Sequence, residues 1–72
     1  MKKPEEIWNI GDIAWFIPHG EKRPQQGEIV TILDNIEIPC ATLIMSIDHK
    51  YRTAMISMLG ETSKEAKVLA ES

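Results

Sequence analysis

Residues 27–33 read Gly-Glu-Ile-Val-Thr-Ile-Leu, a run rich in β-branched residues that lies between a glycine and the turn pair Asp34-Asn35. Branched side chains favour extended backbone, and an Asp-Asn pair favours a turn, so this stretch predicts a strand followed by a hairpin. Apolar residues fill successive positions instead of alternate ones. The strand therefore needs cover on both of its faces.

Three further strands are predicted around this one, over residues 12–17, 41–47 and 51–58. Residues 18–27 hold two prolines and two glycines among polar side chains, which predicts a long loop. Pro39 lacks the N–H that a sheet ladder needs and indicates an edge or a bulge ahead of the third strand. The spacing is that of an antiparallel meander.

The end of the chain predicts a helix. Residues 62–65 read Thr-Ser-Lys-Glu, a capping box in which the threonine oxygen accepts a backbone N–H and the glutamate reaches back to the cap. Ala66, Leu69 and Ala70 recur at helical spacing and form a narrow apolar stripe. Such a helix acts as a lid and adds little to the core.

Length and composition limit the protein to one domain. The 72 residues are 43% hydrophobic and 26% charged, which is typical of a folded globular chain. No apolar run is long enough to span a bilayer, and the first residues lack the apolar region of a signal peptide. A single cysteine, Cys40, indicates a reducing cytoplasm, and a net charge of −3 leaves the partner open.

Residues 11–15 (Gly-Asp-Ile-Ala-Trp) and 27–30 (Gly-Glu-Ile-Val) resemble the opening hairpin of SH3-like barrels of the Tudor and KOW type. Residues 60–66 are similar to the strand-to-helix finish of small barrel proteins that bacteria and phages encode. The resemblance implies a mainly β, five-stranded, bent SH3-like barrel with a short C-terminal α-helix, in which residues 36–39 break one long strand in two. The single domain, residues 1–72, then divides into an N-terminal arm (1–10), a barrel (11–60) and the C-terminal helix (61–72). A phage origin would place the protein in the host cytoplasm.

The residues that could carry chemistry do not combine into a motif. The possible metal ligands are Asp12, His19, Cys40, Asp48 and His49. Their spacing in the sequence matches no metal-binding motif, so we expect no metal. We expect no cofactor, because no glycine-rich phosphate loop is present. Cys40 follows a proline in an apolar stretch and is interpreted as a core residue. We therefore expect no enzyme, although an active site built across an oligomer, as in the plasmid-borne barrel type of dihydrofolate reductase, stays open.

Positive and aromatic residues gather in the first and third inter-strand loops, which lie at one end of Tudor-type barrels. The candidate binding patch consists of Trp15, Phe16, His19, Lys22, Arg23, His49, Lys50, Tyr51 and Arg52. Such a patch suits a nucleic-acid backbone, a stacked base or an acidic protein surface. By the Tudor resemblance, its three aromatic residues are also candidates for a cage around methylated lysine or arginine. The alternative is that these loop cations are simply solvated.

The two-sided strands point to a partner. A candidate partner or oligomer face consists of Val30, Ile32, Ile44, Met55 and Met58. The leading hypothesis is a non-enzymatic binding module that acts through protein contact, as a phage or mobile-element protein that engages or inhibits a host factor, or through a homodimer. The alternative is a nucleic-acid-binding module that uses the basic and aromatic loop patch. No membrane contact is expected.

Overall fold

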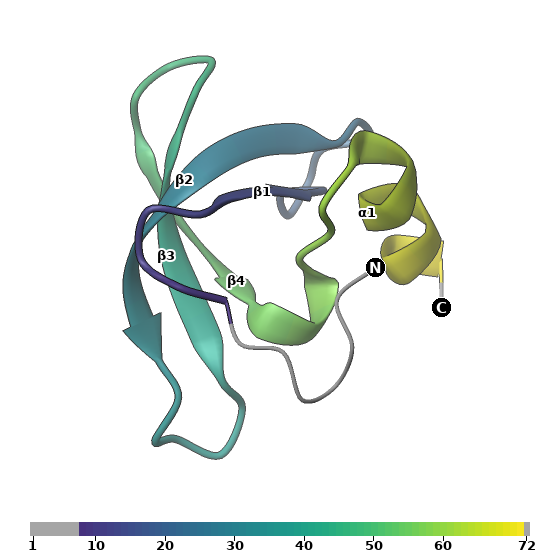
Figure 1. Cartoon of the computed structure of the whole chain (residues 1–72). Helices are drawn as coiled ribbons and strands as arrows, with labels where there is room; N and C mark the ends of the chain where they lie inside the picture. Colours follow the sequence, from purple (N-terminus) through teal and green to yellow (C-terminus); the bar gives the residue numbers. More distant parts are fainter. Residues whose placement is uncertain (1–7, 72) are drawn as a thin grey trace.

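The computed structural model describes residues 8–71, which form one four-stranded antiparallel sheet followed by a short helix (Figure 1). The sheet has the strand order β1-β2-β3-β4, so each strand pairs with its neighbour in the sequence. The elements are β1 (Ile13–Phe16), β2 (Gln25–Leu33), β3 (Cys40–Met45), β4 (Tyr51–Met55), the 3-10 helix η1 (Ile56–Met58) and α1 (Ser63–Glu71). The mainly β fold and the C-terminal helix are thus confirmed. Most of the predicted N-terminal arm, residues 1–7, lies outside the described residues.

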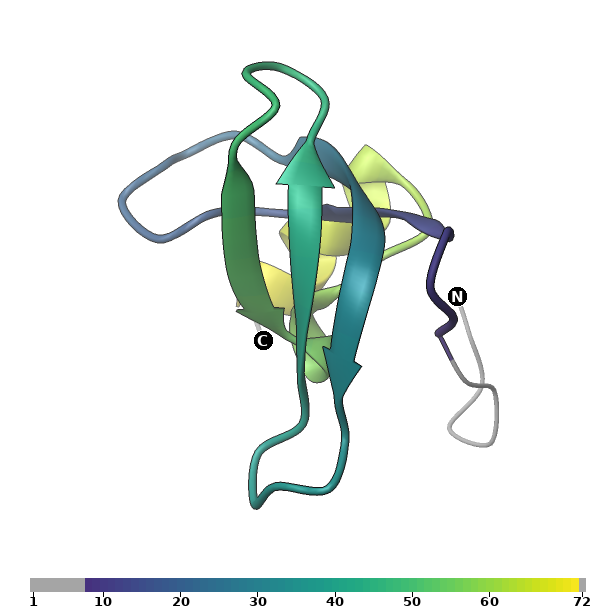
Figure 2. The same cartoon turned by 90° about the vertical axis from the view of Figure 1, so that its left-hand side faces the viewer.

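Strand β2 is the centre of the fold because it pairs with β1 at its start and with β3 along most of its length. Phe16 lies opposite Gln25, and Gly27 lies opposite Met45. Figure 2 shows the result: β2 curves, and β1 crosses behind β3 and β4. A β-carbon on Gly27 would lie 2.9 Å from Met45 Sδ and 3.1 Å from Leu43 Cβ, so glycine at this position permits the close crossing.

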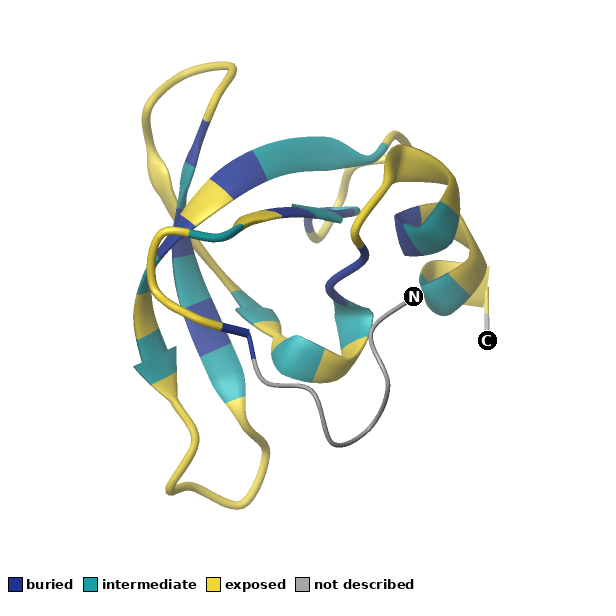
Figure 3. Ribbon diagram, in the orientation of Figure 1, coloured by how far each residue is buried: buried dark blue, intermediate teal, exposed yellow. Residues whose placement is uncertain are grey.

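The core lies inside the bend of the sheet, between β1 on one side and β3 and β4 on the other (Figure 3). Its largest fully buried side chains are Ile29, Leu43 and Met45. They are joined by Trp8, Ala14 and Phe16 from the first part of the chain, by Ala41 on β3 and by Leu59 after η1. Helix α1 lies on the far side of β1 from β3 and β4 (Figures 1 and 2). It buries only Ala66, which agrees with its predicted role as a lid.

The predicted strand 51–58 ends early, at Met55, and residues 56–58 form the 3-10 helix instead. The cause is Pro39, which has no N–H to extend the ladder. Its carbonyl still accepts a hydrogen bond from the Ile56 N–H at 3.0 Å, and the chain then turns away from β3. The turn carries residues 59 and 60 back to β1.

Gly60 joins the end of the chain to β1. Trp15 and Gly60 exchange two backbone hydrogen bonds of 2.8 Å, which make an isolated antiparallel bridge. Gly60 also lies under the first turn of α1, where an added β-carbon would be 2.7 Å from the Ala66 nitrogen. Among the described residues this single bridge takes the place where the SH3 resemblance leads us to expect a fifth strand.

The helix begins with the predicted cap, in a modified form. The Glu65 N–H donates to Thr62 Oγ1 at 3.1 Å. Glu65 Oε1 accepts a 3.3 Å hydrogen bond from the Glu61 N–H, one residue before the cap that the capping box predicts. Leu69 is half-buried and Ala70 is exposed, so the apolar stripe is narrower than the sequence indicates.

Replacing Gly60 by alanine should destabilise the protein by about 2 kcal/mol or more, because its new methyl group would meet backbone atoms that cannot rotate away. The measurement is the urea midpoint of unfolding. Gly11→Ala is the control, since Gly11 has a positive φ of 97° but nothing within 4 Å, so its cost is backbone strain alone, about 1–2 kcal/mol. An equal or smaller loss for Gly60→Ala would contradict the close packing of α1 on Gly60.

Candidate binding surfaces

The side of the sheet that faces away from the core presents two rows of apolar residues, which we call the outer face. In the first row Ile13 lies opposite Glu28, Glu28 opposite Ile44, and Ile44 opposite Tyr51. In the second row, strand pairing places Leu33, Cys40 and Met55 side by side. Tyr51 is 69% exposed, and Ile13, Leu33 and Met55 are each between 42% and 45% exposed. Much of this apolar area therefore contacts water.

A row of threonines separates the two apolar rows. Thr42 lies opposite Thr31 on β2 and opposite Thr53 on β4. The Thr42 and Thr53 hydroxyls form a hydrogen bond with an Oγ1···Oγ1 distance of 3.1 Å. Cross-strand threonine pairs stabilise a sheet while leaving its surface flat and polar.

A bulge in β2 decides which residues reach the outer face. Ile29 lies opposite Leu43 and Thr31 opposite Thr42, so Val30 is an extra residue without a partner. After Val30, odd-numbered side chains of β2 point to the outer face and even-numbered ones to the core, the reverse of the order before it. Ile32 therefore lies opposite the buried Ala41, on the core side, and Leu33 is turned to the outer face.

The five residues of the predicted partner face therefore do not lie on one surface. Ile44 and Met55 lie on the outer face. Val30 is half-buried at the bulge, Ile32 packs against the core, and Met58 lies in η1. Strand pairing adds Ile13, Leu33, Cys40 and Tyr51 to the outer face, which the sequence reasoning missed. Cys40, interpreted from the sequence as a core residue, is half-buried on this face and lies outside the core.

The first and third loops do lie at the same end of the molecule, as the sequence analysis expects. The Ser46 N–H donates to the Gln26 carbonyl at 3.0 Å, and a recess of about 320 Å³ lies between the loops. It is lined by Pro18, Glu21, Gln25, Met45, Ile47, Asp48 and Arg52. The recess itself therefore combines one cation with two carboxylates, whereas Lys22, Arg23 and Lys50 are exposed in the loops around it.

The β3–β4 loop has a defined shape. The His49 N–H donates to the Met45 carbonyl at 2.8 Å, and the Lys50 N–H donates to Asp48 Oδ1 at 3.0 Å. His49 adopts a left-handed conformation with φ of 57°, which histidine tolerates better than most residues. The exposed His49 and Lys50 are thus held at a fixed place beside β4.

The three candidate aromatic residues do not come together. Phe16 is 3% exposed and belongs to the core. Trp15 is half-buried on β1, and Tyr51 lies on β4. β2 and β3 stand between those two strands in the order of the sheet. No aromatic cage is formed by Trp15, Phe16 and Tyr51.

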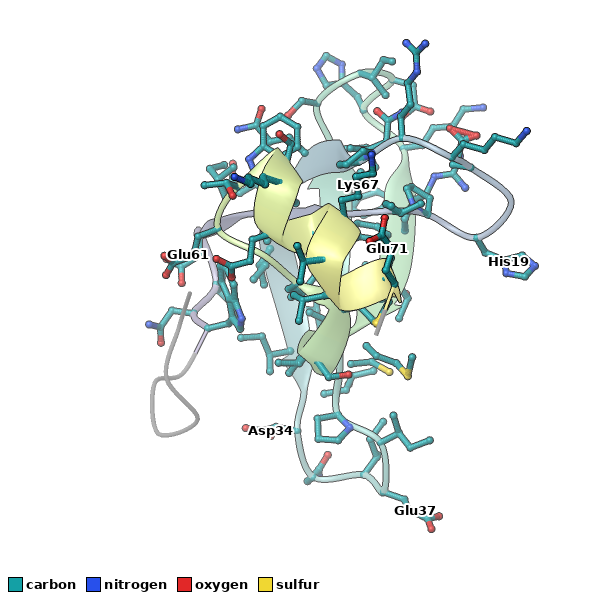
Figure 4. All side chains as sticks on the ribbon, turned by 90° about the vertical axis from the view of Figure 1, so that its right-hand side faces the viewer. His19, Asp34, Glu37, Glu61, Lys67 and Glu71 are labelled. Atoms are coloured by element: carbon teal, nitrogen blue, oxygen red, sulfur yellow. The ribbon has the colours of Figure 1, made fainter. Side chains whose placement is uncertain are left out.

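A groove of about 270 Å³ runs beside the free edge of β4. Its lining comes from the end of β1 and the loop after it, from β4 and from η1, and consists of Phe16, Ile17, His19, Thr53, Ala54, Met55 and Met58. Figure 4 shows the loop extended sideways, with His19 on its outer bend. The groove is below the volume of about 300–1,000 Å³ that is usual for small-molecule sites, but it has room for a few side chains.

Between residues 8 and 71, no group of three or more His, Cys, Asp or Glu side chains is placed to hold a metal ion. No helix in that part of the chain is long and apolar enough to cross a membrane. The chain matches no protein-family model, no curated protein and no solved structure. The candidate sites therefore rest on the geometry described above.

The bulge predicts a difference between two neighbouring residues. Ile32→Thr should lower the free energy of unfolding by about 1–3 kcal/mol, because it places a hydroxyl against the core and removes apolar contacts. Leu33→Thr should cost less than about 1 kcal/mol, because Leu33 faces solvent and threonine favours strands. Urea unfolding of both variants is the measurement, and the opposite ranking would mean that β2 has no bulge at Val30.

Proposed function

We propose that this chain is a non-enzymatic binding module that acts through contact with another protein. The observation that carries the proposal is the outer face, where the sheet presents two apolar rows, including Tyr51, Leu33 and Met55, to water. Gathered apolar residues on a small protein mark a contact surface more often than scattered ones do. The partner is another protein or a second copy of the chain.

The chemistry of the outer face supports this proposal. Aromatic and methionine side chains are enriched at the centre of protein interfaces, and Tyr51 and Met55 both lie on β4. The threonine row and Glu28 between the apolar residues supply hydroxyl and carboxylate groups for hydrogen bonds with a partner. A small core also gains stability when a partner covers part of its surface.

We also propose that the fold is an SH3-like barrel whose fifth strand has shrunk to the bridge between Trp15 and Gly60. Support comes from the curvature of β2, from the 3-10 helix η1 before the bridge, and from the sequence resemblance to small barrels of bacteria and phages. In that setting the module would engage or inhibit a host factor in the host cytoplasm.

A double variant of the outer face, Ile13→Thr with Leu33→Thr, tests the binding proposal. Light scattering after size exclusion should give a dimeric or partner-bound mass for the unaltered chain purified from its native cells, and a monomer mass for the double variant. Val68→Thr on α1 is the control, because Val68 is 53% exposed but lies off the sheet. A strictly monomeric unaltered chain with no bound protein would contradict the proposal.

The charge distribution favours one second candidate, a nucleic-acid-binding module. The two loops and the start of β4 carry four of the eight Lys and Arg residues, Lys22, Arg23, Lys50 and Arg52, but only two of the eleven acidic ones, Glu21 and Asp48. Cations gathered at this end of the sheet suit phosphates, and Tyr51, which is exposed on the outer face at the start of β4, offers a ring on which a base can stack.

For this candidate, Lys22→Glu with Arg23→Glu should abolish binding to a fluorescent single-stranded oligonucleotide, and binding by the unaltered chain should weaken steeply with salt. Lys64→Glu with Lys67→Glu on α1 is the matched control with the same change in charge. Fluorescence anisotropy at about 50 mM salt is the measurement, because electrostatic contacts with phosphates are strong there. No binding by the unaltered chain would exclude this candidate.

A further inference from the structure

The outer edge of β4 has backbone groups that no other strand uses. The Met45 N–H donates to the Lys50 carbonyl, and the Ile56 N–H donates to the Pro39 carbonyl. Because antiparallel pairing alternates, the backbone groups of Arg52 and Ala54 face β3, whereas the N–H groups of Tyr51, Thr53 and Met55 and the carbonyls of Tyr51 and Thr53 point outward. Within residues 8–71 these five groups have no hydrogen-bond partner, whereas the Met55 carbonyl caps the start of η1.

Such an edge is a template for another strand. Natural edges are often protected by proline, by a bulge or by charged side chains; β4 (Tyr-Arg-Thr-Ala-Met) has no proline and no bulge, and its one charged residue is Arg52. The groove beside it has an apolar lining, with Phe16, Ala54 and Met58 on the core side of β4. An added strand would therefore gain backbone hydrogen bonds at the edge and apolar contacts in the groove.

Charge along the edge gives the added strand a direction. Arg52 lies opposite Leu43, so its side chain is on the same side of the sheet as the groove, at the end of β4 next to the basic loops. His19 lines the groove, and Lys22 and Lys50 are exposed at this same end, where Glu21 and Asp48 share the recess with Arg52. The acidic residues Asp34 and Glu37 lie at the opposite end, in the β2–β3 loop (Figure 4).

We propose that an extended segment of another protein pairs antiparallel with β4 and extends the sheet as a fifth strand. The segment has an apolar residue opposite Ala54, over the groove, and an acidic residue two positions later, opposite Arg52. Antiparallel pairing fixes this order, because the added strand runs toward the basic loops as β4 runs away from them. The inference rests on the proposed function as a protein-binding module and names a second surface and its partner.

A second copy of the chain fits this edge less well than an acidic segment does. Antiparallel pairing of two β4 strands about Thr53 would place Arg52 of each copy opposite Ala54 of the other. The second β4 strand would then bring no carboxylate to either arginine, and the two arginines would share one face. Like charges on neighbouring strands are unfavourable, so the charge pattern favours an acidic segment of another protein over a second copy of this chain.

The test uses a fluorescent peptide, Thr-Val-Thr-Leu-Thr-Glu-Thr-Gln, and anisotropy titrations. Thr53→Pro removes the central outward N–H but leaves the β3–β4 ladder intact, because that N–H faces away from β3. It should weaken peptide binding about tenfold or more, since it removes a hydrogen bond and adds a ring at the edge. Thr53→Val is the matched control, because it also removes the Thr42 hydroxyl contact but keeps the N–H.

A charge exchange tests the direction and does not depend on proline. Arg52→Glu should weaken binding of the peptide, and a peptide with lysine in place of its glutamate should restore it, whereas Lys64→Glu on α1 should have no effect. A peptide of the same composition with glutamate and valine exchanged should bind the unaltered chain more weakly, because its acid would lie away from Arg52.

Four results would overturn the inference: no peptide binding, equal binding by the Thr53→Pro and Thr53→Val variants, equal binding of the exchanged peptide, or displacement of the peptide by a single-stranded oligonucleotide. A dimer that Thr53→Pro dissociates would assign the edge to a second copy instead. The outer-face variant Ile13→Thr with Leu33→Thr should still bind the peptide. If that variant loses its protein partner while Thr53→Pro does not, the proposed function stands and only this inference fails.

Discussion

The double pairing of β2 is the constraint on which the rest of this structure depends. One strand bonds to β1 at its start and to β3 along the remainder, so it has to curve, and the two neighbours have to cross closely. Gly27 permits the crossing, and the unpaired Val30 adds local twist where the strand bends. The buried side chains Ile29, Leu43 and Met45 fill the space that this curvature encloses.

The same curvature separates the surfaces. The convex side becomes the outer face, with its apolar and threonine rows. The concave side becomes the core, and at its margin the end of β1 and the edge of β4 stand apart and leave the groove. Charge follows this division from end to end, since the loops beside the groove are basic and the β2–β3 loop at the other end carries Asp34 and Glu37 (Figure 4). One bent strand thus produces two surfaces of different chemistry.

Local signals in the sequence predict most of the fold. β-branched runs, turn pairs and the capping box place four strands and the helix within a few residues. The face to which each side chain points is harder to predict, because nothing in Ile-Val-Thr-Ile-Leu signals a bulge. The one extra residue turns Ile32 to the core and Leu33 to the outer face. The two loops lie at one end of the molecule because of its topology, and their role as one binding patch stays a prediction. The groove depends on where β4 ends, which Pro39 decides from a distant part of the chain.

The bridge between Trp15 and Gly60 has a consequence for the order of folding. The β2–β3 and β3–β4 hairpins join residues that are close in sequence, so closing them costs little entropy. Trp15 and Gly60 lie far apart in the sequence, and joining them closes a loop that contains β2, β3 and β4, at a cost in entropy that only the finished core offsets. On a ribosome, Trp15 would therefore emerge well before its partner Gly60, and this bridge could close only after β2, β3 and β4 had been synthesised.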